Sequence, residues 1–313
     1  MTMTFINGIS FSGGFAFTTE APAPTENTAA WFGGGSWPGP VATVDRITFA
    51  TDTNTASVRG PLSSGRSYLA AAGNTTDGWF GGGYGSGTNT HSTVQRITYA
   101  TDTATASVRG PLSLARWGVA AAGNSDYGWF GAGYNAGTRS TVDRITYATD
   151  TNTASVRGPL SLDRYLLAAA GNTTDGWFGG GFQTDSTVDR ITYATDTATA
   201  SVRGPLSAAK YLLAAAGNTT NGWFGGGASG PVSTVQRITY ATDTATASVR
   251  GPLSSGRRGL AAAGNTTNGW FGGGQGDYST VDRITYATDT ATASTRGPLS
   301  SARDVLAAAG GVQ

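Results

Sequence analysis

The hydrophobic and polar positions of this chain follow one pattern of four short segments. The stretch 93–100, TVQRITYA, is rich in β-branched and aromatic residues, and the TDT after it is a turn signal. A second short strand, TASVRGPLS (105–113), ends at Gly-Pro, where proline is tolerated. A small-residue segment such as LLAAAG (212–217) and a strand of the type WFGGG complete the set. No segment shows a sustained period of 3.6 residues, so the pattern predicts almost no helix.

The pattern recurs six times, at intervals of 46 to 50 residues. A period of this size is typical of a propeller blade with four strands. The sequence therefore predicts an all-β fold, a six-bladed β-propeller of four-stranded blades. The WFGGG block (once WFGAG) marks the copies and begins at Trp31, Trp79, Trp129, Trp177, Trp223 and Trp270.

The two ends of the repeat region complement one another. The last copy finishes with LAAAGG (306–311), an inner strand with no outer strands after it. The first copy starts at Trp31, and the aligned stretch before it, APAP (21–24), is a poor strand. We therefore expect the C-terminal strand to complete the first blade and to close a propeller domain that spans residues 28–313.

The blades resemble those of kelch-type β-propellers over residues 28–313. The shared features are the inner strand LAAAG, a second strand that ends in a glycine doublet, a third strand with tyrosine, and a fourth strand that leads to an arginine. Kelch repeats usually place tryptophan seven residues after the tyrosine, whereas here Ala106 follows Tyr99 at that spacing. The resemblance implies the architecture but no ligand.

Near-identical copies such as DTATASVRGPLS also resemble repeats in predicted structural proteins of bacteriophages that infect cyanobacteria and other marine bacteria. This resemblance implies a protein of the virion surface, such as a tail fibre, a spike or a capsid decoration, assembled in the host cytoplasm. It implies a host-surface glycan or protein as ligand, other virion proteins as partners, and a homo-oligomer within a particle as one arrangement. A passive scaffold propeller is the alternative.

Residues 1–27 stand outside the repeats. The stretch 9–17 is apolar around a glycine pair and predicts a short strand or hairpin, which is too short to fold alone. Two interpretations stay open, namely packing on the chain's own propeller and docking onto another virion protein. The candidate anchoring residues are Ile9, Phe11, Phe15 and Phe17.

Composition excludes several classes of function. The chain has no cysteine, one histidine (His91), one lysine (Lys210) and a net charge of +1. These features argue against disulfides, a thiol nucleophile, a metal site and nucleic-acid binding. No apolar run approaches the length of a membrane span, so we expect no membrane insertion. We also expect no cofactor.

Catalysis by paired carboxylates is also disfavoured. The only glutamates are Glu20 and Glu26, so a glycosidase would need aspartates, with Asp163 and Asp185 as the pair best placed to meet. We therefore expect a protein that is not an enzyme. The recurrent arginines are expected to pair with the recurrent TDT aspartates, such as Asp102, and those aspartates to stabilise their turns as Asx residues.

Differences among the copies are confined to two connections. The spacing from the valine of TV to the next tryptophan is 35 residues in every internal repeat, so the length varies only between GGG and TV. A second variable patch follows PLS. In an antiparallel blade both connections emerge on the same rim, which predicts one diversified face and one uniform face.

The diversified face carries aromatic residues that the repeat does not require. Rigid aromatics among Gly, Ser, Asn and Thr are typical of recognition surfaces. Flat rings would suit a glycan, and on chemistry alone a protein ligand is equally compatible with them. The alternative is that about half of these rings only cover blade edges. The candidate ligand-binding residues are Trp37, Tyr68, Tyr84, Trp117, Tyr134, Tyr165, Phe182, Tyr211 and Tyr278.

Overall fold

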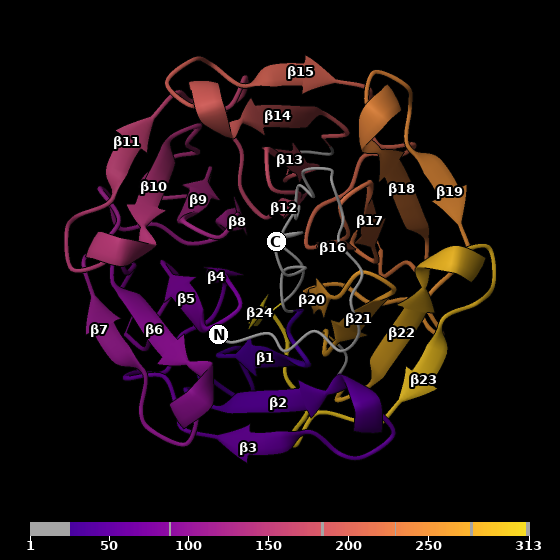
Figure 1. Cartoon of the computed structure of the whole chain (residues 1–313), viewed down its shortest axis with the longest axis horizontal. Helices are drawn as coiled ribbons and strands as arrows, with labels where there is room; N and C mark the ends of the chain where they lie inside the picture. Colours follow the sequence, from indigo (N-terminus) through magenta and orange to yellow (C-terminus); the bar gives the residue numbers. More distant parts are fainter. Residues whose placement is uncertain (1–25, 88, 183–184, 229, 276–277, 311–313) are drawn as a thin grey trace, which may run out of the picture.

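Six four-stranded antiparallel sheets surround a central axis in the computed structural model of the chain (Figure 1). The structure describes residues 26–87, 89–182, 185–228, 230–275 and 278–310. The fold is therefore the predicted six-bladed, all-β propeller. Helical geometry within the described residues is limited to single 3₁₀ turns after the third strand of each blade, η1 (Phe49–Thr51), η2 (Tyr99–Thr101), η3 (Tyr147–Thr149), η4 (Tyr193–Thr195), η5 (Tyr240–Thr242) and η6 (Tyr286–Thr288).

Each blade runs outward from a short alanine strand at the axis. The innermost strands are β24 (Ala307–Ala309), β4 (Ala70–Gly73), β8 (Ala120–Gly123), β12 (Ala168–Gly171), β16 (Ala214–Gly217) and β20 (Ala261–Gly264). The second strands are β1 (Ala29–Gly33), β5 (Asp77–Gly81), β9 (Tyr127–Gly131), β13 (Asp175–Gly179), β17 (Asn221–Gly225) and β21 (Asn268–Gly272).

The outer half of each blade repeats with the same regularity. The third strands are β2 (Val44–Thr48), β6 (Val94–Thr98), β10 (Val142–Thr146), β14 (Val188–Thr192), β18 (Val235–Thr239) and β22 (Val281–Thr285). The outermost strands are β3 (Ser57–Arg59), β7 (Ser107–Arg109), β11 (Ser155–Arg157), β15 (Ser201–Arg203), β19 (Ser248–Arg250) and β23 (Ser294–Arg296). We number the blades 1 to 6 in the order of their second strands.

Blade 1 closes the ring. Strand β1 pairs with β2 on one side and with β24 on the other, and Trp31 lies opposite Ala309. This arrangement confirms the prediction that the C-terminal strand completes the first blade. It also leaves a seam in blade 1 between the innermost strand β24 and the second strand β1. In every other blade a turn connects the innermost strand to the second strand, whereas β24 and β1 come from opposite ends of the repeat region.

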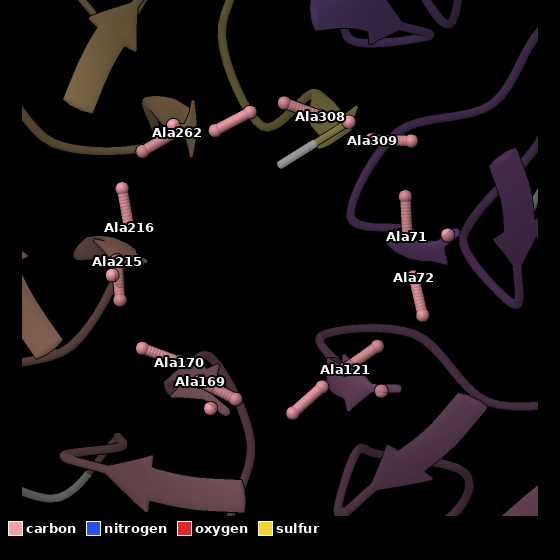
Figure 2. A pocket seen from close by; sticks show the side chains of 18 residues that line it. Ala71, Ala72, Ala121, Ala169, Ala170, Ala215, Ala216, Ala262, Ala308 and Ala309 are labelled. Carbon is pink, nitrogen blue, oxygen red and sulfur yellow. The ribbon is translucent and has the colours of Figure 1, made fainter. Parts of the chain in front are cut away.

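A channel follows the axis. Among the described residues its lining consists of alanines and glycines from the six innermost strands and Gly310, and Figure 2 shows the alanine methyl groups around an open centre. Its volume is about 100 Å³. Small residues are required here because six strands converge on one axis.

Aromatic rings fill the interfaces between blades. The Phe130 ring of blade 3 packs against Gly81 of blade 2, where a Cβ atom would lie only 2.9 Å from the ring. Trp79 stacks on Tyr147 of the next blade, with ring centroids 3.7 Å apart. The glycine after WF therefore leaves room for the phenylalanine ring of the neighbouring blade. Each of the six hydrophobic clusters combines side chains of two adjacent blades.

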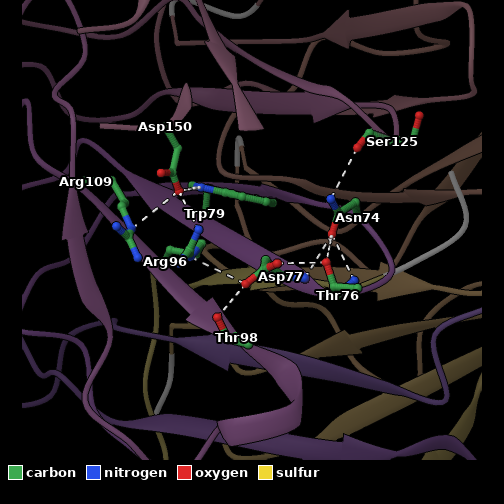
Figure 3. A network of polar contacts seen from close by, with 9 residues as sticks. All are labelled: Asn74, Thr76, Asp77, Trp79, Arg96, Thr98, Arg109, Ser125 and Asp150. Carbon is green, nitrogen blue, oxygen red and sulfur yellow. Dashed lines mark hydrogen bonds and ion pairs between the residues drawn. The ribbon is translucent and has the colours of Figure 1, made fainter. Parts of the chain in front are cut away.

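One buried aspartate clamps each pair of blades. The Oδ2 atom of Asp150 accepts the indole N–H of Trp79 at 2.8 Å and lies 3.1 Å from Arg96 and 3.4 Å from Arg109 (Figure 3). The predicted Arg–Asp pairing is confirmed. The Asx role predicted for the TDT aspartates is wrong, because this oxygen joins two blades instead of stabilising its own turn. The same clamp is made by Asp102, Asp196, Asp243, Asp289 and Asp52.

Candidate functional site

The two variable connections of each blade lie together on one face, which we call the variable face. Tyr84, after β5, and Ser67, before β4, exchange backbone hydrogen bonds of 2.7 and 2.9 Å. Trp117 and Tyr134 do the same in blade 3, at 3.2 and 2.8 Å. Equivalent backbone contacts join the connections of every blade, so the predicted separation into a variable and a uniform face is confirmed. The remaining pairs are Tyr165–Phe182, Tyr211–Ala228, Arg258–Gln275 and Asp304–Ser36.

Seven of the nine candidate aromatic residues form one continuous strip, the aromatic arc. Trp117 is its hub, with ring centroids 5.1 Å from Tyr68, 5.1 Å from Tyr165 and 5.4 Å from Tyr134. These contacts are edge-on or tilted, a geometry that aromatic pairs prefer. Each ring of the arc is half-buried except that of Phe182, which is 40% exposed. In order around the face the arc contains Tyr84, Tyr68, Trp117, Tyr134, Tyr165, Phe182 and Tyr211.

Trp37 and Tyr278 do not belong to the arc. They lie in the loops of blades 1 and 6, the two blades outside the arc, and among the described residues neither ring contacts another. The paired positions of these two blades are polar, and Arg258 donates a hydrogen bond to the side chain of Gln275. The face is therefore divided into an aromatic part over blades 2 to 5 and a polar part over blades 1 and 6. The Trp37 side chain is 58% exposed.

The arc borders a closed ring of backbone hydrogen bonds around the axis. Each of six residues donates its N–H to the carbonyl of the preceding member, with N···O distances of 2.6 to 2.8 Å. All six have positive φ, although four are not glycine, and such a conformation costs about 1–2 kcal/mol per residue. The ring holds the aromatic loops at fixed spacing and surrounds a recess of about 60 Å³. Its members are Tyr68, Gly118, Leu166, Leu212, Gly259 and Val305.

A buried cation anchors each variable connection from below. The guanidinium of Arg116, directly before Trp117, donates to the carbonyl of Phe130 at 2.9 Å and lies 3.1 Å from Asp143. Burial lowers the pKa of Arg116, and Asp143 opposes that shift. Sequence reasoning missed these residues. The available signal was a cation at this place in all six copies: Arg66, Arg116, Arg164, Lys210, Arg257 and Arg303.

Two of these cations face no carboxylate among the described residues. Four blades place an aspartate on the third strand, whereas Gln95 and Gln236 replace it in blades 2 and 5. Both glutamines still accept the N–H of a serine, as the aspartates do. Without a countercharge, burial lowers the pKa of Arg66 to about 10 and that of Lys210 to about 8.

The other candidate groups do not converge. Asp185 accepts the N–H of Thr187 at 2.7 Å and lies 3.8 Å from Arg164, whereas Asp163 is exposed. Burial lowers the pKa of His91, and Arg66 adds to that shift. Within the described ranges no group of three or more His, Asp or Glu side chains is arranged to hold a metal. The described part of the chain also contains no helix long and apolar enough to cross a bilayer.

No protein-family model matches the chain, and no curated protein is similar to it. The fold itself is compatible with a binding or structural module. The predicted anchoring residues Ile9, Phe11, Phe15 and Phe17 lie outside the described residues.

Proposed function

We propose that this chain is a non-enzymatic binding module whose ligand lies along the aromatic arc. The observation that carries the proposal is the continuity of the arc. The propeller repeats its structural residues in all six blades, whereas on the variable face the contacting aromatic rings of the described residues are confined to blades 2 to 5. A structural requirement of the fold would recur in every blade. Recognition of one elongated ligand requires such an asymmetric surface.

A glycan suits the arc best. The rings offer apolar faces and edges together with tyrosine hydroxyl groups, and the rigid axial ring positions them before the ligand arrives. The resemblance to phage repeats supports a virion-surface location and a host glycan as ligand. Many copies on one particle would raise the apparent affinity by about 10² to 10⁴ without new contacts. Residues 1–27 would then join the propeller to other virion proteins.

The first experiment is a glycan array that includes bacterial surface polysaccharides, probed with the full chain clustered on beads. We expect Trp117→Ala, Tyr134→Ala and Tyr165→Ala each to weaken binding of a hit by about tenfold or more, the effect of removing a central aromatic anchor. Affinity is then measured by calorimetry on the monovalent chain, and near-ultraviolet circular dichroism verifies that each variant is folded.

Trp37→Ala is the matched control. It removes an exposed tryptophan from the same face but outside the arc, so we expect its binding to equal that of the wild type. A folded variant that combines Trp117→Ala, Tyr134→Ala and Tyr165→Ala and still keeps full affinity would contradict the proposal. Absence of any ligand at high valency would favour the passive scaffold, in which the variable loops have no recognition role.

A further inference from the structure

On the uniform face, the first residue of the second strand contacts two groups of the third strand. In blade 2 the Oδ1 atom of Asp77 accepts a 2.5 Å hydrogen bond from the Thr98 hydroxyl and lies 3.5 Å from Nε of Arg96 (Figure 3). Blade 4 repeats the arrangement with Asp175, at 2.6 Å from Thr192 and 3.6 Å from Arg190. The arginine and threonine of the third strand thus form a carboxylate-binding pair.

Other blades fill the same place with other side chains. Asn221 in blade 5 and Asn268 in blade 6 each accept the threonine hydroxyl at 3.0 Å. In blade 3 the ring of Tyr127 lies under the guanidinium of Arg144, with 4.5 Å between the ring centroid and Cζ. Five blades therefore supply their own partner for the threonine or the arginine.

Blade 1 has the arginine and threonine of this pair but no side chain that occupies the place of Asp77. Ala29 pairs with Thr48 in the register in which Asp77 pairs with Thr98, and a methyl group accepts no hydrogen bond. Arg46 keeps its 3.0 Å contact with Asp102, but among the described residues it has no second ion pair of the kind that Arg96 makes with Asp77. A cavity of about 350 Å³ opens here, lined by Ala29, Arg46 and Thr48 together with Glu26, Asn27, Thr28, Trp31, Thr75 and Tyr99.

We infer that this seam cavity is a carboxylate-binding site, with the bound carboxylate in the place that Asp77 occupies in blade 2. The carboxylate has two candidate sources. One is an acidic ligand from outside the chain, and the other is the chain itself, whose only glutamates, Glu20 and Glu26, precede the seam. The site lies on the uniform face, so its test is independent of the aromatic arc.

The probe is N-acetyl-aspartate N-methylamide, which carries a single side-chain carboxylate, and the readout is the Nε–Hε cross-peak of Arg46 in NMR spectra of the full chain. We expect the probe to shift this peak in the Glu20→Gln, Glu26→Gln double variant. The matched asparagine compound should leave it unchanged. A shift in the wild type as well identifies an external ligand, whereas a shift confined to the double variant identifies the chain's own glutamates. No shift in the double variant would overturn the inference.

Ala29→Asp provides a second, opposite test. The new carboxylate should reproduce the contacts of Asp77 within the blade, so we expect a higher melting temperature and probe binding at least tenfold weaker. Ala29→Asn is the matched control, because an amide can accept the hydroxyl of Thr48 but cannot neutralise Arg46. Unchanged probe binding in a folded Ala29→Asp variant would show that the carboxylate does not bind at this place.

Discussion

Replacing Asp150 with asparagine is expected to lower the free energy of unfolding by about 2–4 kcal/mol. This loss is slightly smaller than the loss from breaking a fully buried ion pair, because the two arginines are partly exposed. The Oδ2 atom of Asp150 accepts hydrogen bonds from Trp79 and Arg96 of the preceding blade and forms an ion pair with Arg109 of the same blade. The asparagine amide keeps one acceptor oxygen but carries no negative charge to balance the two guanidinium groups. Its NH₂ group is also a donor that faces other donors. Equilibrium unfolding in urea, followed by tryptophan fluorescence, measures the loss.

Two further variants make this expectation specific. Asp163→Asn neutralises an exposed aspartate on the variable face and should change stability by less than about 0.5 kcal/mol. Asp52→Asn breaks the clamp that joins blade 6 to blade 1, where Trp270 and Arg283 lie 2.9 and 3.0 Å from the carboxylate. We expect Asp52→Asn to lower the free energy of unfolding by the same amount as Asp150→Asn. A loss below about 1 kcal/mol in both clamp variants would contradict the role assigned to these aspartates.

Features that repeat in every blade were accessible from the sequence. Short alternating segments at a constant period predict four-stranded blades, and the inner strand at 306–311 without outer strands predicts closure at the first blade. The separation of variable from uniform connections followed from antiparallel topology alone. These inferences hold because they depend on periodicity and connectivity, which one sequence with six copies records directly.

Features that distinguish one blade from another required coordinates. Trp37 has the same chemistry as Trp117, but only the pairing of loops shows that Trp37 lies outside the arc. The positive φ of Leu166 and Val305 carries no glycine signal, because tertiary contacts around the axis impose it. The seam cavity depends on the register that sets Ala29 opposite Thr48. Local residue preferences contain none of this information.

Lys210 makes the stability of the propeller depend on pH. It is 5% exposed, and its Nζ atom reaches the carbonyl of Thr234 at 3.4 Å. Burial lowers its pKa from 10.5 to about 8. Below pH 8 the folded and unfolded chains both hold the proton, and the folded state bears the cost of a buried charge. Between pH 8 and 10.5 only the unfolded chain holds it, so the free energy of unfolding rises with pH in this interval.

Lys210→Met is therefore expected to raise the melting temperature at pH 7 and to remove this pH dependence. From pH 8 to 10 the wild type should gain about 1–2 kcal/mol relative to the variant, less than the full 1.4 kcal/mol per pH unit because solvent screens part of the charge. Lys210→Arg is the matched variant, and Arg66 opposite Gln95 in blade 2 shows that a guanidinium is accommodated beside a glutamine. Burial lowers the pKa of Arg66 to about 10, so we expect an arginine at position 210 to stay charged up to about pH 9. Between pH 8 and 9 the Lys210→Arg variant should therefore lack the pH dependence of the wild type, without the gain at pH 7. Parallel stability curves for wild type and Lys210→Met across pH 8–10 would show that Lys210 stays protonated in the folded protein.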